Sequence, residues 1–394
     1  MTAIKEISMI SKRFGDDFCS DEANKNNNSR QSLKRKTGFN KSEKWQKIEK
    51  TLDQDPVDVS SLKQFAISPG GLLDDELRKE IWPKLLDVDV DNIPPKPGVE
   101  ILHGHRDYNQ VVLDVNRSLK RFPPGMDENI RLGLQDQLVD LIMRVLVNHD
   151  ELHYYQGYHD ICVTFLLVVG EDVAFALVDK LSLNHLRDFM DANMDRTKHI
   201  LNYLYPIVGK SNPELREFME RSEVGTVFSL SWLITWYGHV LNDLRQIVRF
   251  YDFFIACHPL MPIYLAAAIV LHRADEILAS ECEMCIVHGL LSKIPQDLPF
   301  EQLISKAGDL YLQYPPSDLA YDAILNFQRT QSYAKARSKN LQKFTCNKKT
   351  DKKHWFIFDQ DGKSGFLKFT FWTVTTAVVS AAVIAYLRSW EWEW

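Results

Sequence analysis

The chain has 394 residues, 45% of them hydrophobic and 25% charged, a composition typical of globular proteins with one large domain or two ordinary ones. The net charge of −6 and the pI of about 6.1 exclude a strongly basic nucleic-acid-binding protein. Six cysteines over this length do not form a disulfide framework, and residues 1–17 lack an apolar signal core, so we expect a reducing, cytosolic environment.

The N-terminal part divides into a tail and a lead-in. Residues 1–42 are polar and contain the low-complexity run NKNNNSRQSLKRKTG, which predicts a disordered tail. Residues 43–69 have the pattern of a short helical hairpin.

Residues 70–314 have helical periodicity, with glycine and proline at the joints and neither strand-like alternation nor a repeat. The sequence therefore predicts an all-α, multi-helical domain. The expected helices are 74–86, 106–122, 128–148, 158–169, 171–180, 182–190, 194–208, 212–222, 226–241, 244–257, 262–272, 274–280, 282–292 and 298–313.

The C-terminal part has the pattern of a membrane anchor. Residues 315–368 are expected to form a linker, partly helical at first and then basic, suited to an anionic membrane face. Residues 369–387 carry no charge and would span roughly 28 Å as a helix, about the hydrocarbon thickness of a bilayer. We expect a transmembrane tail anchor here, with a buried helix as the alternative, and a short lumenal tail at 388–394.

The stretch YNQVVLDVNRSLKRFPPG, residues 108–125, predicts an amphipathic helix with one polar residue of interest. Arg117 lies roughly 160° from the apolar stripe and should point outward, with Asp114 three residues earlier within reach of the guanidinium. The alternative is an ordinary solvated ion pair, and Lys120 and Arg121 could compete for any role of Arg117.

A second polar junction is HYYQGYHDI, residues 153–161. Gln156 is not an acid, a base or a nucleophile, but its amide can hold a water or a carbonyl in place. Gly157 would allow a close backbone approach, and Tyr155 would pack as a local brace. His153 and His159 are expected to make loop hydrogen bonds rather than act as ligands or bases.

These stretches carry a family resemblance. Val111-x-x-Asp114-x-x-Arg117 resembles the IxxDxxR motif of the TBC-domain Rab GTPase-activating proteins, and Tyr155-Gln156-Gly157 resembles their YxQ/YQG motif. Residues 70–86 and 231–254 resemble two further motifs of that family, and the matching framework residues are Gly71, Arg78, Trp82, Trp232, Arg249 and Asp252. Two departures are the valine at 111 and the late position of Pro123.

The resemblance implies a TBC fold, and a function in which Arg117 is an arginine finger and Gln156 a glutamine finger, lent to a GTP-bound Rab. Asp114 would hold Arg117 ready. Such a protein is a GTPase activator with no cofactor of its own, acting on the GTP and Mg²⁺ held by the Rab. The resemblance also implies a Rab of ER-to-Golgi traffic and an endoplasmic reticulum or early Golgi membrane. The alternative is a catalytically silent Rab-binding or membrane scaffold with the same fold.

Other chemistry finds less support in the sequence. Cys282-x-x-Cys285 has no second pair, so we expect no metal site. Ser229 and Ser231 lack a Gly-x-Ser-x-Gly context. No GxxxxGK[ST] run occurs, so we expect no nucleotide pocket of the chain's own.

Overall fold

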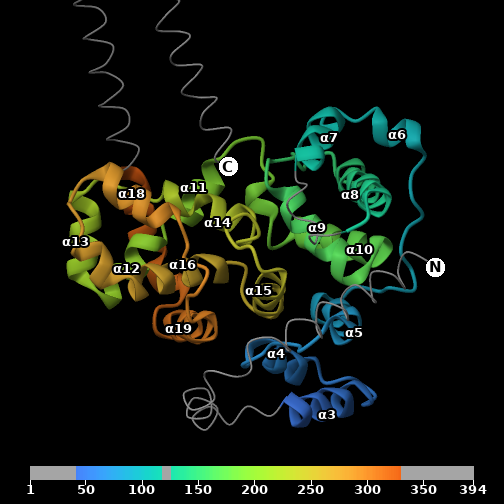
Figure 1. Ribbon diagram of the computed structural model, residues 1–394, viewed down its shortest axis with the longest axis horizontal. Coiled ribbons are helices and arrows are strands. Elements are labelled where there is room, and N and C mark those ends of the chain that lie inside the picture. Colours follow the sequence, from blue (N-terminus) through green and yellow to red (C-terminus); the bar gives the residue numbers. More distant parts are fainter. Residues whose placement is uncertain (1–40, 118–125, 330–394) are drawn as a thin grey trace, which may run out of the picture. The chain divides into compact units, whose positions relative to one another are not determined.

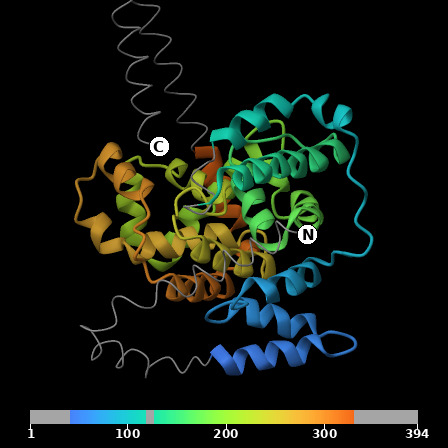
Figure 2. The same ribbon diagram turned by 45° about the vertical axis from the view of Figure 1, so that its right-hand side comes forward.

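The computed structural model describes residues 41–117 and 126–329. In these residues every regular element is a helix and none is a strand, which confirms the all-α class for this part (Figures 1 and 2). The helices are α3 (Lys41–Leu52), α4 (Val59–Ile67), α5 (Asp75–Leu86), α6 (Val99–His103), α7 (Tyr108–Arg117), α8 (Glu128–Asn148), α9 (Tyr158–Val169), α10 (Glu171–Leu183), η2 (Arg187–Phe189), α11 (Asp195–Leu201), α12 (Leu204–Ser211), α13 (Pro213–Arg221), η3 (Val227–Ser229), α14 (Leu230–Ile234), α15 (Leu244–Ala256), α16 (Met261–His272), α17 (Ala274–Leu278), α18 (Met284–Ser292) and α19 (Phe300–Gln313).

Short polar side chains begin several of these helices. Asp58, Asp74, Asp127, Asn212 and Asp243 each accept a hydrogen bond from a backbone N–H in the first turn of the helix that follows. Because those N–H groups have no partner within the helix, such caps stabilise each start by about 1 kcal/mol and place it in the sequence.

Two groups of helices pack around central ones. α8 packs against α6, α7, α9 and α10, while α16, buried along most of its length, packs against α12 and α19. α5 lies against α9, α10 and α15, and α3, α4 and α5 follow one another in a stack (blue in Figures 1 and 2). Residues 43–69 therefore form a helical hairpin against the helical domain, and its first helix begins at Lys41, inside the expected tail.

Tertiary packing shortens or divides several expected helices. The expected helix 182–190 is the end of α10 followed by the single turn η2, and 194–208 is divided between α11 and α12. The expected helix 226–241 ends at Ile234, because Trp236 and Tyr237 adopt positive φ angles of 44° and 65°. Both rings are buried against α15, where Trp236 meets Tyr251 with ring centroids 5.2 Å apart, so aromatic packing overrides helix propensity.

The region after α19 begins as a helix, as expected for the first part of the linker, but this helix packs into the core. Residues 316–329 form a helix, and its side chains Leu319 and Ala323 are fully buried. Several expected segments lie outside the described residues: residues 1–40 of the tail expected at 1–42, the basic stretch at 335–353, the apolar segment 369–387 and the lumenal tail 388–394. Of the helices that are described, none has both the length and the hydropathy needed to cross a membrane.

Candidate functional site

Helix α7 presents Arg117 to solvent. Val111 and Val115 are fully buried on its inner side, as the apolar stripe requires. The Arg117 side chain, on the last residue of the helix, is 64% exposed. Its Nε donates to the carbonyl oxygen of Leu113 at 3.3 Å, and its Nη2 forms an ion pair with Asp114. Residues 118–125, which include Lys120, Arg121 and Pro123, lie outside the described part.

Asp114 is not part of a solvated surface. Its side chain is only 1% exposed, and its second oxygen, Oδ2, accepts a hydrogen bond from the Tyr154 hydroxyl at 3.0 Å. Burial, and then the negative charge of Asp114, raise the pKa of Tyr154 well above its usual value, so the phenol stays neutral and donates. A buried carboxylate with a second donor orders an arginine better than an exposed ion pair does.

The start of α7 is hydrogen-bonded to the loop at 150–156, which contains Tyr154. Arg106 Nη2 donates to the carbonyl oxygen of Leu152 at 2.9 Å and approaches His153 Nδ1 at 3.3 Å. The backbone N–H of Tyr154 points to Asp107 Oδ2 at 3.5 Å. Both ends of α7 are therefore hydrogen-bonded to the loop at 150–156 that leads to Gln156.

Gln156 is exposed at the end of this loop, and its neighbours hold the loop in place. The Tyr155 hydroxyl donates to the carbonyl oxygen of Ile234 at 3.0 Å, and its ring packs against Phe189. Gly157 has a φ of 112°, and a Cβ there would stand 2.9 Å from Thr235 Cγ2. The loop thus lies between α7 on one side and α14 on the other, and only glycine fits at 157.

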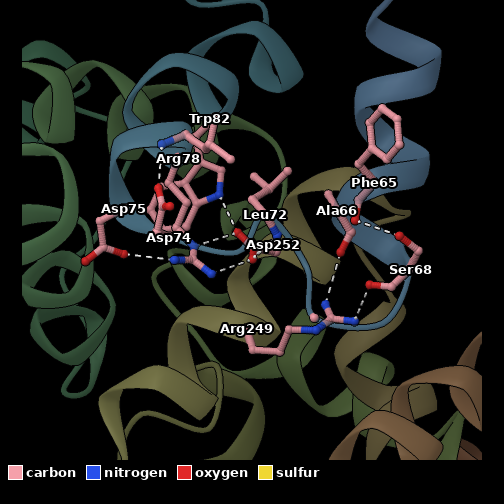
Figure 3. A network of polar contacts seen from close by, with 12 residues as sticks. Phe65, Ala66, Ser68, Leu72, Asp74, Asp75, Arg78, Trp82, Arg249 and Asp252 are labelled. Carbon is pink, nitrogen blue, oxygen red and sulfur yellow. Dashed lines mark hydrogen bonds and ion pairs between the residues drawn. The ribbon is translucent and has the colours of Figure 1, made fainter. Parts of the chain in front are cut away.

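Framework residues that include Arg78, Trp82, Arg249 and Asp252 form a second, buried network (Figure 3). Asp252, which is 0% exposed, accepts from Arg78 Nε at 3.0 Å, Arg78 Nη2 at 2.9 Å and Trp82 Nε1 at 2.9 Å. The backbone N–H of Leu72 donates to it at 2.9 Å. A Cβ on Gly71 would lie 2.4 Å from Asp252 Oδ2, so this glycine permits the close approach.

Arg249 binds the end of α4 and the start of the loop that connects α4 to α5. It donates to the carbonyl oxygens of Ala66, Ile67 and Ser68 at 3.0–3.1 Å and pairs with Glu301 at 2.8 Å. This network fastens α4 and α5 to α15, so five of the six framework residues stabilise the packing of these helices. Trp232 is separate from this network. It lies in α14 and is buried against Phe228 and Tyr237. The last residue of α14, Ile234, accepts the hydrogen bond of the Tyr155 hydroxyl.

The remaining sequence candidates have local roles. His159 lies in the first turn of α9 rather than in a loop, with Nδ1 3.0 Å from the Tyr154 hydroxyl. The buried Ser229 hydroxyl donates to the carbonyl oxygen of Thr226 at 2.8 Å. Cys282 and Cys285 flank the start of α18, and within the described residues no three potential ligands gather as a metal site would need.

The sequence did not indicate three residues that connect the segments of Arg117 and Gln156: Tyr154, Arg106 and Asp107. Two adjacent tyrosines before Gln156 were the only local signal, because a contact across 40 or more residues leaves no periodic trace in the sequence.

A model of the Rab-GTPase-TBC domain matches residues 75–278 of this chain, which include Arg117 and Gln156. The chain belongs to the Rab-GTPase-TBC domain family. This confirms the resemblance noted in the sequence. Human TBC1 domain family member 20 is 58% identical over 301 residues, covering 76% of this chain and 75% of the human protein. The protein of the same name from Bos taurus is 50% identical over 358 residues, covering 88% of this chain and 89% of its own.

A more distant sequence relative and a solved structure are also similar to this chain. The GTPase-activating protein gyp10 of Schizosaccharomyces pombe is 31% identical over 274 residues, covering 67% of this chain and 72% of its own. The crystal structure of the Ypt/Rab-GAP domain of Gyp1p superposes with a TM-score of 0.58 at 13% identity, covering 69% of this chain and 98% of that domain. At this identity the structural likeness shows the TBC fold alone.

Proposed function

We propose that this TBC-domain protein accelerates GTP hydrolysis by Rab GTPases, with Arg117 as an arginine finger and Gln156 as a glutamine finger. One observation carries the proposal. The two residues are exposed, and the segments that bear them are hydrogen-bonded together through buried Asp114 and partly buried Tyr154. The relative named as a GTPase-activating protein in Schizosaccharomyces pombe supports the same activity.

The chemistry of GTP hydrolysis explains why these two side chains suffice. Negative charge spreads over the phosphate oxygens in a loose transition state, and an arginine supplied from outside accelerates the reaction roughly 10³- to 10⁵-fold. The guanidinium remains charged and presents a planar fork of donors. The Gln156 amide would orient the attacking water. The GTP and Mg²⁺ belong to the Rab, so the chain acts as an activator that needs no cofactor or nucleotide pocket of its own.

A phosphate-release assay tests this activity. Purified Rabs loaded with GTP are mixed with the full chain, with Arg117→Ala, with Arg117→Lys or with Gln156→Ala. We expect the wild-type protein to accelerate release from at least one Rab, and each substitution to lower that rate by about 100-fold or more, lysine included. Binding with equal background release from all four proteins would instead support the scaffold function.

We further propose that residues 369–387 anchor the protein in the endoplasmic reticulum or early Golgi membrane, with the TBC domain in the cytosol and residues 388–394 in the lumen. The uncharged 19-residue segment supports this, since its length suits a thin bilayer. This address favours a Rab of ER-to-Golgi vesicle transport as the partner.

A fractionation experiment tests the anchor. The full chain should remain in the membrane pellet after alkaline carbonate washing and co-localise with an endoplasmic reticulum or Golgi marker. Deletion of 369–387 should release it to the supernatant. A full chain released by carbonate would contradict a membrane-spanning anchor.

A further inference from the structure

His159 stands behind the residues that hold the arginine finger. It lies in the first turn of α9 and is 8% exposed. Its Nδ1 is 3.0 Å from the Tyr154 hydroxyl, which is itself 3.0 Å from Asp114 Oδ2. Asp114 in turn pairs with Arg117. A continuous series of polar contacts therefore connects α9 to Arg117.

The available protons determine which atom donates in each hydrogen bond between His159, Tyr154 and Asp114. A carboxylate paired with a guanidinium can only accept hydrogen bonds, so the single hydroxyl proton of Tyr154 must point to Asp114. The Tyr154 oxygen can then only accept from the imidazole. His159 must therefore carry its proton on Nδ1, and that N–H aims the phenol at Asp114.

The other side of the ring faces acidic and basic groups. His159 Nε2 is 3.8 Å from Asp160 Oδ1, and Asp160 Oδ2 is 3.5 Å from His239 Nδ1. At 3.8 Å the contact between Nε2 and Asp160 is electrostatic rather than a hydrogen bond.

We propose that His159 is a positioning residue for the arginine finger, acting through Tyr154 and Asp114. This rests on the proposed GTPase activation. Because α9 begins directly after Gly157, the same ring also connects the arginine finger to the helix that follows the Gln156 loop.

A double-mutant cycle tests the proposal on the full chain. His159→Leu removes the donor, whereas His159→Asn keeps an N–H donor close to the position of Nδ1. Loss of one hydrogen bond should lower kcat for stimulated hydrolysis about fivefold in His159→Leu with KM unchanged, while His159→Asn stays within about twofold of wild type. In an Arg117→Ala background, His159→Leu should cause no further loss.

His149→Leu is the matched control, because His149 is a partly buried histidine that also pairs with a carboxylate, Asp179 at 2.9 Å, outside the contacts that hold the finger. It should leave kcat unchanged. An equal loss for His159→Leu with and without Arg117, an equal loss for His159→Asn and His159→Leu, or a change confined to KM would overturn the proposal. Absence of any wild-type stimulation would instead overturn the proposed function itself.

A second readout does not depend on activity. In the full chain with ¹⁵N-labelled histidine rings, the signal lost in His159→Asn identifies His159. Its shifts should show a proton on Nδ1, and a ring protonated on Nε2 alone would overturn the proposal even in an active protein.

Discussion

At the scale of single residues, the exposed side chains of the site depend on buried neighbours. Arg117 is 64% exposed, yet its partner Asp114 is 1% exposed and also accepts from Tyr154. An exposed ion pair contributes at most about 1 kcal/mol, but a buried carboxylate that loses one donor is left poorly compensated. The Arg117–Asp114 pair is thus better suited to orient the guanidinium than to stabilise the protein surface.

Gly157 provides the residue-scale prediction. Its φ of 112° disfavours any other residue, and an added Cβ would contact Thr235 Cγ2 at 2.9 Å. We expect Gly157→Ala to cost about 1–3 kcal/mol in the free energy of unfolding and to lower stimulated GTP hydrolysis by displacing Gln156. Urea unfolding and the phosphate-release assay measure both effects.

Gly133→Ala is the control for that change. Gly133 lies inside α8, and a Cβ there would meet nothing within 4 Å. The added methyl should stabilise the helix by up to about 1 kcal/mol and leave hydrolysis unchanged. Equal effects of the two substitutions would show that the positive φ and the close contact at Gly157 do not require glycine.

At the scale of helices, hydrogen bonds from two buried basic side chains join the lead-in hairpin to the domain. Lys44 on α3 is 8% exposed and donates to the carbonyl oxygens of Phe65 at 2.8 Å and Pro69 at 3.0 Å. Arg249 donates to carbonyl oxygens of the same turn, at the end of α4. Two cations therefore satisfy the carbonyls at this helix end and connect α3, α4 and α15.

This arrangement predicts a pH effect on stability. Burial, and then the charge of Arg249, lower the pKa of Lys44 to about 8. In the unfolded chain the lysine keeps its proton up to about pH 10.4. Between these values the unfolded state binds more protons, so stability from this group rises with pH, by up to about 3 kcal/mol in total.

Urea unfolding between pH 7.5 and 10 of the wild type, Lys44→Met and Lys47→Met measures this effect. Tyrosines and cysteines titrate in the same range, and the comparison subtracts them. Relative to Lys44→Met, the wild type should gain stability as the pH rises. Lys47, 61% exposed on the same helix, should be dispensable for the gain. Parallel curves for wild type and Lys44→Met would contradict the prediction.

At the scale of the whole molecule, the described domain extends past α19. In the helix 316–329, Leu319 and Ala323 are fully buried, and the Tyr264 hydroxyl donates to the carbonyl oxygen of Tyr314 at 2.6 Å. Residues 316–329, which the sequence assigned to the start of a linker, therefore contribute buried side chains to the core.

Leu319→Ala should lower the free energy of unfolding by about 2–5 kcal/mol, since it leaves a cavity in a closed core. The midpoint of thermal unfolding should fall accordingly. Leu312→Ala removes a similar side chain that is 79% exposed and should change the midpoint by no more than a degree or two. A midpoint unchanged by Leu319→Ala would show that this helix does not contribute to the folded core.

The sequence by itself determined the helical class, most helix starts, the outward direction of Arg117 and the family, because helical periodicity, capping residues and motif spacing are local properties. Only the tertiary structure decided that Asp114 is buried, that Tyr154 and His159 stand behind it, that Trp236 and Tyr237 end a helix, and that 316–329 joins the core. Each of these depends on contacts between residues far apart in the chain or on the packing of several helices at once, and neither leaves a regular pattern in the order of the amino acids.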